Sequence, residues 1–177
     1  MKTIKNYGLL SLLMALLPTA LWAGNWGDKP VNGKTYLISL GYDNNSVLTP
    51  YKYSWLRDTG LAFQTYTEGN DSQKWKLIAV AGKSDCYQFV NADGEEALDM
   101  ALNDPNKTWG WPCLWRQTIT NPNQQVYITK NGNGYRLSAV SAKNGQTYYI
   151  TTGSISSVNG YYCGYENSEA SAATLQF

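Results

Sequence analysis

The chain has 177 residues, with 14 lysines and arginines, 13 aspartates and glutamates, and a formal net charge of +1. This balance, without any basic cluster, makes nucleic acid and anionic membrane surfaces poor candidates as partners. Histidine is absent, which excludes Ser-His-Asp and Cys-His nucleophile pairs and the usual histidine-containing zinc sites. We therefore expect no metal site and no cofactor.

The first residues have the layout of a secretory signal peptide. A short basic region is followed by an apolar run from Gly8 to Leu17, by Pro18, and by a small residue, Ala23, where cleavage is expected. The run is shorter than the roughly 20 residues that cross a bilayer. We predict that residues 1–23 are removed and that the mature chain, residues 24–177, is secreted or periplasmic without membrane insertion.

The mature chain is close to neutral and rich in aromatic residues. Removing residues 1–23 takes away two lysines and leaves 12 basic and 13 acidic residues, with six tryptophans and 13 tyrosines. Tyrosine and tryptophan favour strands, and they also suit half-exposed contact surfaces because each has an apolar face and a polar tip. Cys86, Cys113 and Cys163 fit no metal-ligand spacing, and the sequence leaves any disulfide pairing among them open. The composition favours a β-rich protein with an uncharged ligand.

Two short strand-like segments recur three times along the chain. Each alternates apolar with other residues, which is the period of a half-buried strand, and turn-forming residues separate them. The recurring tyrosines, each followed 39 or 40 residues later by the second segment, are Tyr36 with Trp75, Tyr87 with Val126, and Tyr135 with Leu175. The pattern predicts one all-β domain over residues 24–177, with three repeats of about four short strands at about 32–82, 83–133 and 134–177.

Three such units resemble a β-trefoil, and one motif resembles the ricin-type lectins in particular. The segment that ends in Gln73-Lys74-Trp75 resembles the Gln-x-Trp motif that closes each repeat of that family. The middle repeat keeps Gln124 but not the Trp, and the third repeat keeps neither. The resemblance covers roughly residues 32–177. It implies a pseudo-threefold barrel with up to three shallow sugar sites, and therefore a protein that binds a neutral glycan or glycoconjugate.

In that family, a sugar site combines an acidic residue just after the Leu of the second strand, an aromatic residue on the third strand, and an Asn beside the motif's Gln. The middle repeat matches all three positions with Asp99, Trp115 and Asn123, and Gln124 lies behind them. An indole can cover the apolar face of a sugar, a carboxylate accepts from two neighbouring hydroxyls, and an amide both donates and accepts. The resemblance thus predicts one carbohydrate site, of about millimolar affinity.

The Trp-Gly-Trp-Pro stretch that contains Trp109 and Trp111 is an aromatic loop just before the third strand of the middle repeat. Either it forms a wall of the sugar site or it packs on the barrel. The other two repeats match the family pattern poorly. The residues at their acid, aromatic and amide positions are Thr49, Phe63 and Ser72 in the first repeat, and Thr151, Cys163 and Ala172 in the third.

The predicted site residues also have purely structural interpretations. An aspartate such as Asp99 is also typical of a turn, and a strand tryptophan such as Trp115 is also typical of a residue that faces the core. An asparagine that follows a proline, such as Asn123, is typical of a turn. Gln73 and Trp75 are expected in the core. The poor match of two repeats therefore favours a second function, a β-trefoil scaffold that binds or inhibits a protein partner with vestigial sugar sites.

A cluster of carboxylates in a sugar-binding protein raises the question of whether the protein is a glycosidase. Glycoside hydrolysis requires two carboxylates on opposite sides of a substrate, roughly 5 to 9 Å apart. Glu95, Glu96 and Asp99 lie within five residues of one turn and do not enclose a substrate. We expect no enzymatic activity.

Overall fold

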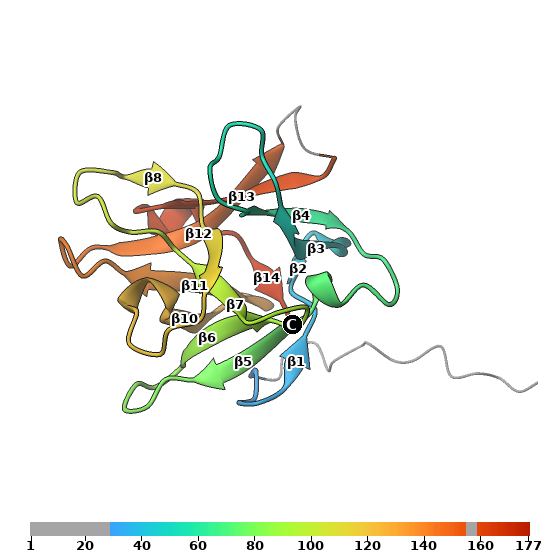
Figure 1. Cartoon of the computed structure of the whole chain (residues 1–177), viewed down its shortest axis with the longest axis horizontal. Coiled ribbons are helices and arrows are strands. Elements are labelled where there is room, and N and C mark those ends of the chain that lie inside the picture. Colours follow the sequence, from blue (N-terminus) through green and yellow to red (C-terminus); the bar gives the residue numbers. More distant parts are fainter. Residues whose placement is uncertain (1–28, 155–158) are drawn as a thin grey trace, which may run out of the picture.

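A computed structural model describes residues 29–154 and 159–177, which form short strands joined by turns (Figure 1). The predicted signal peptide, residues 1–23, lies outside the described residues. Within them, no helix has the length and apolar character that crossing a membrane requires. The strands are β1 (Thr35–Tyr36), β2 (Ser39–Leu40), β3 (Asp43–Tyr51), β4 (Gly60–Thr65), β5 (Trp75–Ala79), β6 (Cys86–Asn91), β7 (Glu96–Asp99), β8 (Trp109–Gly110), β9 (Cys113–Arg116), β10 (Val126–Asn131), β11 (Gly134–Val140), β12 (Thr147–Ser154), β13 (Tyr161–Glu166) and β14 (Leu175–Gln176); the 3-10 turns are η1 (Asp71–Gln73), η2 (Pro122–Gln124) and η3 (Glu169–Ser171).

Antiparallel pairings close some of these strands into a ring that passes through every third of the chain. β1 pairs with β5, β5 with β6, β6 with β10 and β10 with β11. β11 then pairs with β14, and β14 pairs with β2, which follows β1 directly in the chain. Each third of the chain therefore supplies its first and last strands to one closed wall.

The remaining strands form a hairpin in each third of the chain. The hairpins are β3–β4, β7–β9 and β12–β13. Each continues from the opening strand of its own third, because β2 pairs with β3, β6 with β7 and β11 with β12. β4 also pairs with β9 and β13, so the hairpins contact one another. The protein is all-β, as predicted, and the arrangement of ring and hairpins is consistent with a β-trefoil.

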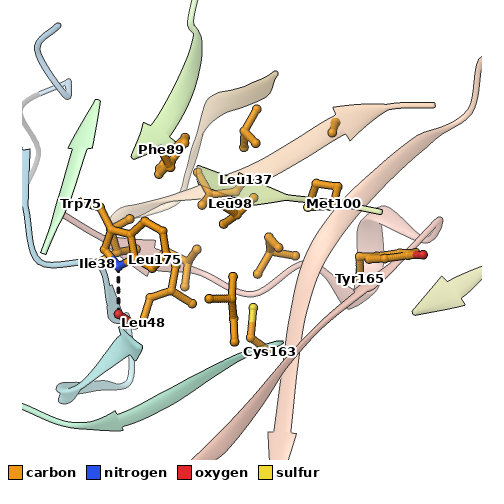
Figure 2. Close-up of a cluster of buried hydrophobic side chains, with 14 of the residues drawn as sticks. Ile38, Leu48, Trp75, Phe89, Leu98, Met100, Leu137, Cys163, Tyr165 and Leu175 are labelled. Carbon is orange, nitrogen blue, oxygen red and sulfur yellow. Dashed lines mark hydrogen bonds between the residues drawn. The ribbon is translucent and has the colours of Figure 1, made fainter. Parts of the chain in front are cut away.

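The hydrophobic core is formed by the inward faces of these strands (Figure 2). Along β5, the buried Trp75 and Leu77 alternate with the exposed Lys76, as expected for a strand with one buried face. The Trp75 indole is fully buried, and its N–H donates to the Leu48 carbonyl oxygen at 2.9 Å (Figure 2). The prediction that Trp75 belongs to the core is confirmed.

One aromatic ring joins the opening strands of the three thirds. Phe177 makes edge-to-face contacts with Tyr36 and Tyr135, at centroid distances of 5.8 and 5.6 Å, and lies 6.3 Å from Phe89. These partners belong to β1, β11 and β6. In Figure 1, the C-terminal end lies just above β1.

The three cysteines are free thiols, so none of them forms the disulfide that the sequence left open. Cys86 and Cys163 are buried, and Cys113 is partly buried. Burial raises the pKa of all three thiols, that of Cys113 to about 12. Because the thiolate is the reactive form, these cysteines are packing residues in this fold.

The burial of Trp75 predicts a large loss of stability on truncation. Trp75→Ala should lower the free energy of unfolding by about 3–5 kcal/mol, because it removes a buried indole and leaves a cavity. The matched control is Trp115→Ala, which removes the same side chain from the surface and should cost less than about 1 kcal/mol. Urea unfolding followed by circular dichroism measures both, and equal losses would contradict the core assignment.

Candidate functional site

The middle hairpin places the predicted site residues on one face. In the pairing of β7 with β9, Asp99 lies opposite Cys113, and Ala97 lies opposite Trp115. Directly opposed residues point to the same side of a sheet, so these four side chains share a face, while the leucines between them point into the core. The Trp115 side chain is 52% exposed. The alternative of an inward-facing indole is therefore wrong.

The Asp99 carboxylate, in contrast, is only 5% exposed and is held by three donors. Oδ1 accepts from the backbone N–H of Ala101 at 2.8 Å. Oδ2 accepts from the side-chain amides of Asn121 at 2.8 Å and Gln124 at 3.4 Å. Burial raises the pKa of Asp99, and these hydrogen bonds oppose the rise. A carboxylate offers about four acceptor positions, so room remains for about one ligand hydroxyl rather than the two expected from the sequence.

A chain of asparagines continues from this carboxylate. Asn121 Oδ1 accepts from the backbone N–H of Asn123 at 3.0 Å, and Asn123 Nδ2 donates to Asn103 Oδ1 at 2.9 Å. The backbone carbonyl of Asn123 accepts from Met100 N–H at 2.9 Å, which fixes the η2 turn against the end of β7. Asn123 thus holds the turn through its backbone, while its side chain lies in the site. Asn123 Oδ1 and Asn103 Nδ2 have no hydrogen-bond partner among the described residues, so both atoms can form hydrogen bonds with a ligand.

These side chains line one pocket of about 340 Å³. The structure brings Asp99, Trp115 and Asn123 together there, with Gln124 fully buried behind them. Sequence reasoning missed three further polar residues of the lining. They are Asp58, from the loop between β3 and β4, with Asn103 and Asn121. The sequence carried one signal, because Asn121 occupies the position before η2 that Asn70 occupies before η1.

Trp109 and Trp111 do not line this pocket. They line an adjoining cavity of about 580 Å³. The Trp111 ring packs between Tyr53 and Tyr162, at centroid distances of 5.6 and 5.4 Å, whereas Trp109 is 60% exposed. Trp109 and Trp111 therefore form a wall of the adjoining cavity and not of the sugar site. Of these two tryptophans, only Trp109 has a largely exposed ring.

The strand register changes the comparison with the other two repeats. Phe63 lies opposite Leu48 and is fully buried, just as Leu114 lies opposite Leu98. Phe63 thus takes the place of Leu114 in the core, and its assignment to an aromatic site position was wrong. By the same register, the positions that correspond to Trp115 are Gln64 in the first third and Glu166 in the last.

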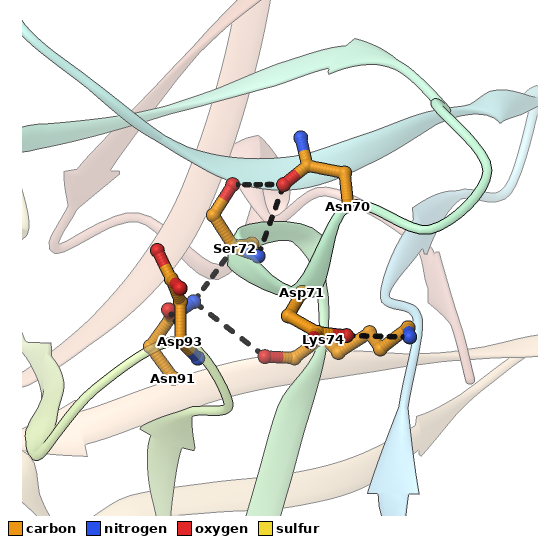
Figure 3. Close-up of polar contacts among 6 residues, drawn as sticks. All are labelled: Asn70, Asp71, Ser72, Lys74, Asn91 and Asp93. Carbon is orange, nitrogen blue, oxygen red and sulfur yellow. Dashed lines mark hydrogen bonds and ion pairs between the residues drawn. The ribbon is translucent and has the colours of Figure 1, made fainter.

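In the turn of the first repeat, the polar side chains bond to one another and to the backbone (Figure 3). Ser72 takes the place of Asn123, and Asn70 Oδ1 accepts both from its backbone N–H at 3.1 Å and from its hydroxyl at 2.7 Å. Asn91 Nδ2 donates to the Ser72 carbonyl at 2.7 Å, and Lys74 pairs with Asp71 beside it. The positions that correspond to Asp99 and Trp115 are Thr49 and Gln64 in this repeat, so neither position carries a carboxylate or an indole.

The two motif glutamines have the same structural task. Gln73 Oε1 accepts from Thr67 N–H at 2.7 Å, and Gln124 Oε1 accepts from Thr118 N–H at 2.8 Å. Both Nε2 groups donate to a backbone carbonyl at 3.0 Å, Gln73 to residue 65 and Gln124 to residue 116. Each also donates to the acid position, which is Thr49 in the first repeat and Asp99 in the second. Gln124 therefore positions Asp99 from behind.

Comparison with solved structures supports the fold. The Polyporus squamosus lectin, solved with a human-type influenza-binding epitope, is similar with a TM-score of 0.61 and 16% identity, over 84% of this chain and 49% of that chain. The Rhizoctonia solani agglutinin is similar with a TM-score of 0.57 and 15% identity, over 85% of this chain and 99% of that chain. A Bauhinia bauhinioides kallikrein inhibitor, solved with bovine trypsin, is similar with a TM-score of 0.60 and 12% identity, over 84% of this chain and 93% of that chain.

At these identities the likeness shows the fold alone, an all-β architecture consistent with a β-trefoil. This chain spans about half the length of the Polyporus lectin. No protein-family model matches the sequence, and no curated protein matches it closely.

The environment of Asp99 predicts an unusual titration. Its carboxyl should titrate above the ordinary aspartate value of about 3.9, because burial penalises the charged form. Asn121→Ala should raise that pKa further, since it removes a donor to the ionised form. Carboxyl ¹³C NMR of the labelled protein measures both midpoints. A midpoint at or below 3.9, or a fall in the variant, contradicts this description of the site.

Proposed function

We propose that this protein is an exported β-trefoil lectin of the ricin type that binds a neutral glycan through one site in its middle repeat. The observation that supports the proposal is an exposed indole, Trp115, beside a buried carboxylate and an amide chain in one pocket. Aromatic faces cover the C–H face of a sugar, and polar groups around them match its hydroxyls. Export by residues 1–23 remains a prediction.

In this proposal, the residues of the pocket have distinct roles. Trp115 forms the stacking surface, and Asp99 accepts from one sugar hydroxyl with its remaining lone pair. Asn123 Oδ1 accepts and Asn103 Nδ2 donates, and Asp58 adds an exposed carboxylate at the rim. Gln124 and Asn121 position Asp99 and do not need to contact the ligand. A shallow site of this kind gives a Kd of about 1 mM, or about −4 kcal/mol.

We propose binding rather than hydrolysis, although Asp58 and Asp99 line the same pocket. A glycosidase needs one carboxyl that delivers a proton to the leaving oxygen. Burial raises the pKa of Asp99, but both of its oxygens accept hydrogen bonds from protein donors, which oppose that rise. Glu95 and Glu96 are exposed and do not line the pocket. Because both oxygens are already held as acceptors, we propose that Asp99 accepts from a ligand hydroxyl rather than delivering a proton.

The second candidate is a scaffold that binds or inhibits a protein partner. It is favoured by the similarity in fold to the Bauhinia inhibitor and by the absence of the site residues from the first and last repeats. It requires no sugar at the Trp115 pocket. A glycan screen therefore separates the two candidates.

The screen applies the mature protein to an array of neutral glycans. Wild-type protein should bind a subset, and Trp115→Ala should weaken that binding at least about tenfold, because stacking and apolar burial are lost. Gln64→Ala, at the corresponding register position of the first repeat, should leave binding unchanged. If no glycan binds and a protein partner co-purifies, the scaffold is the correct function.

Binding should also depend on pH through Asp99. The carboxylate is the acceptor, and its pKa is raised, so affinity should be constant near neutral pH and fall in mild acid, at pH values above about 3.9. Isothermal titration from pH 7.5 to pH 4 measures this. Asp58→Asn should retain the acid-induced loss. Equal affinity at pH 4 and pH 7 would contradict the role of Asp99.

A further inference from the structure

We infer that the Trp115 pocket is one end of a longer cleft, and that the ligand is an oligosaccharide with a second stacking surface on Trp109. This inference rests on the proposed function and extends it from a single sugar to a chain of sugars. It depends on the segment between β7 and β9, residues 100–112, which we call the arm.

The two cavities beside the arm are contiguous. The pocket of about 340 Å³ and the cavity of about 580 Å³ share Asp58, Ala101 and Cys113 in their linings. The smaller pocket is near the lower limit of roughly 300–1,000 Å³ for small-molecule sites. The two together offer much more room than one sugar ring needs. A ligand seated on Trp115 can therefore continue past Asp58 without leaving a concave surface.

Each of the two cavities has an exposed indole in its lining. Trp115 is 52% exposed in the smaller pocket, and Trp109 is 60% exposed in the lining of the larger cavity. Polar side chains lie around the larger cavity, and they include Asp58, Arg57 and Lys107. No ion pair involves any of these three among the described residues. Alternating aromatic faces and unpaired polar groups are what successive sugar units require.

The arm is fixed from behind by the last third of the chain. Tyr148 donates its hydroxyl to the Lys107 carbonyl at 2.7 Å, and Asn144 Nδ2 donates to the Pro105 carbonyl at 2.9 Å. Asn167 N–H donates to the Thr108 carbonyl at 2.9 Å. β8 then pairs with β13, beside which it lies in Figure 1. The wall that carries Trp109 is therefore preorganised, and ordering it costs little on binding.

The Asp99 carboxylate also holds the turn from which the arm begins. Ala101, where the arm begins, has a φ of +52°, a left-handed conformation that is costly for a residue with a side chain. Asp99 Oδ1 accepts from the Ala101 N–H and so holds this turn. The turn redirects the chain from β7 into the arm. Asp99 thus positions the arm while it faces the pocket.

The test is a series of linear oligosaccharides with one to six units. The probes are the β-1,4-linked glucose, β-1,4-linked N-acetylglucosamine and mannose series, together with the array glycans that bind best and their shorter fragments. Affinity measured by isothermal titration should rise at least about tenfold from the one-unit to the longer members of the bound series. Trp109→Ala should remove about five- to tenfold from the longer members and leave the shortest unchanged.

Tyr42→Ala is the matched control, because it also removes an exposed aromatic ring but lies in neither cavity. It should leave the whole series unchanged. Binding that needs Trp115 but is equally tight for every length, with no effect of Trp109→Ala, overturns the extended cleft and leaves the lectin function intact. Failure of every glycan to bind overturns both.

Discussion

The geometry of the site depends on a buried carboxylate at the end of β7. A charged group out of water is costly unless donors surround it, and Asp99 meets that requirement with three donors from two separate turns. The Ala101 N–H starts the arm, while Asn121 and Gln124 belong to the turn that precedes β10. Satisfying one carboxylate therefore fixes both the arm and the η2 turn, which are two of the segments that border the Trp115 pocket.

The repeated fold explains why this requirement does not arise in the first repeat. In the first repeat, Gln73 makes the corresponding contacts, but its partner at the acid position is the neutral hydroxyl of Thr49. The turn is then stable without a ligand-facing carboxylate, and Ser72 is bonded to Asn70 (Figure 3). The motif Gln is thus part of the scaffold, and the function depends on what each repeat places in front of it. Fold alone does not determine that choice.

The sequence could predict the features that depend on local periodicity and on residue type. Spacing identified strand-like segments in each repeat, and the Gln-x-Trp resemblance placed Trp75 in the core and Gln124 behind Asp99. The sequence did not identify Asp58 and Asn103 as site residues, because they reach the pocket from loops whose paths depend on tertiary contacts. It misplaced Phe63 because one residue of register exchanges the two faces of a strand.

In the proposed complex, a sugar stacks on Trp115 and contacts Asp99 and Asn123. The most direct measurement is a ¹H–¹⁵N NMR titration of the mature protein with the best glycan from the array. We expect saturable shifts of the Trp115 indole N–H and of the Asn123 side-chain amide, while the buried Trp75 indole stays unchanged. Saturable shifts confined to residues outside this pocket would contradict it.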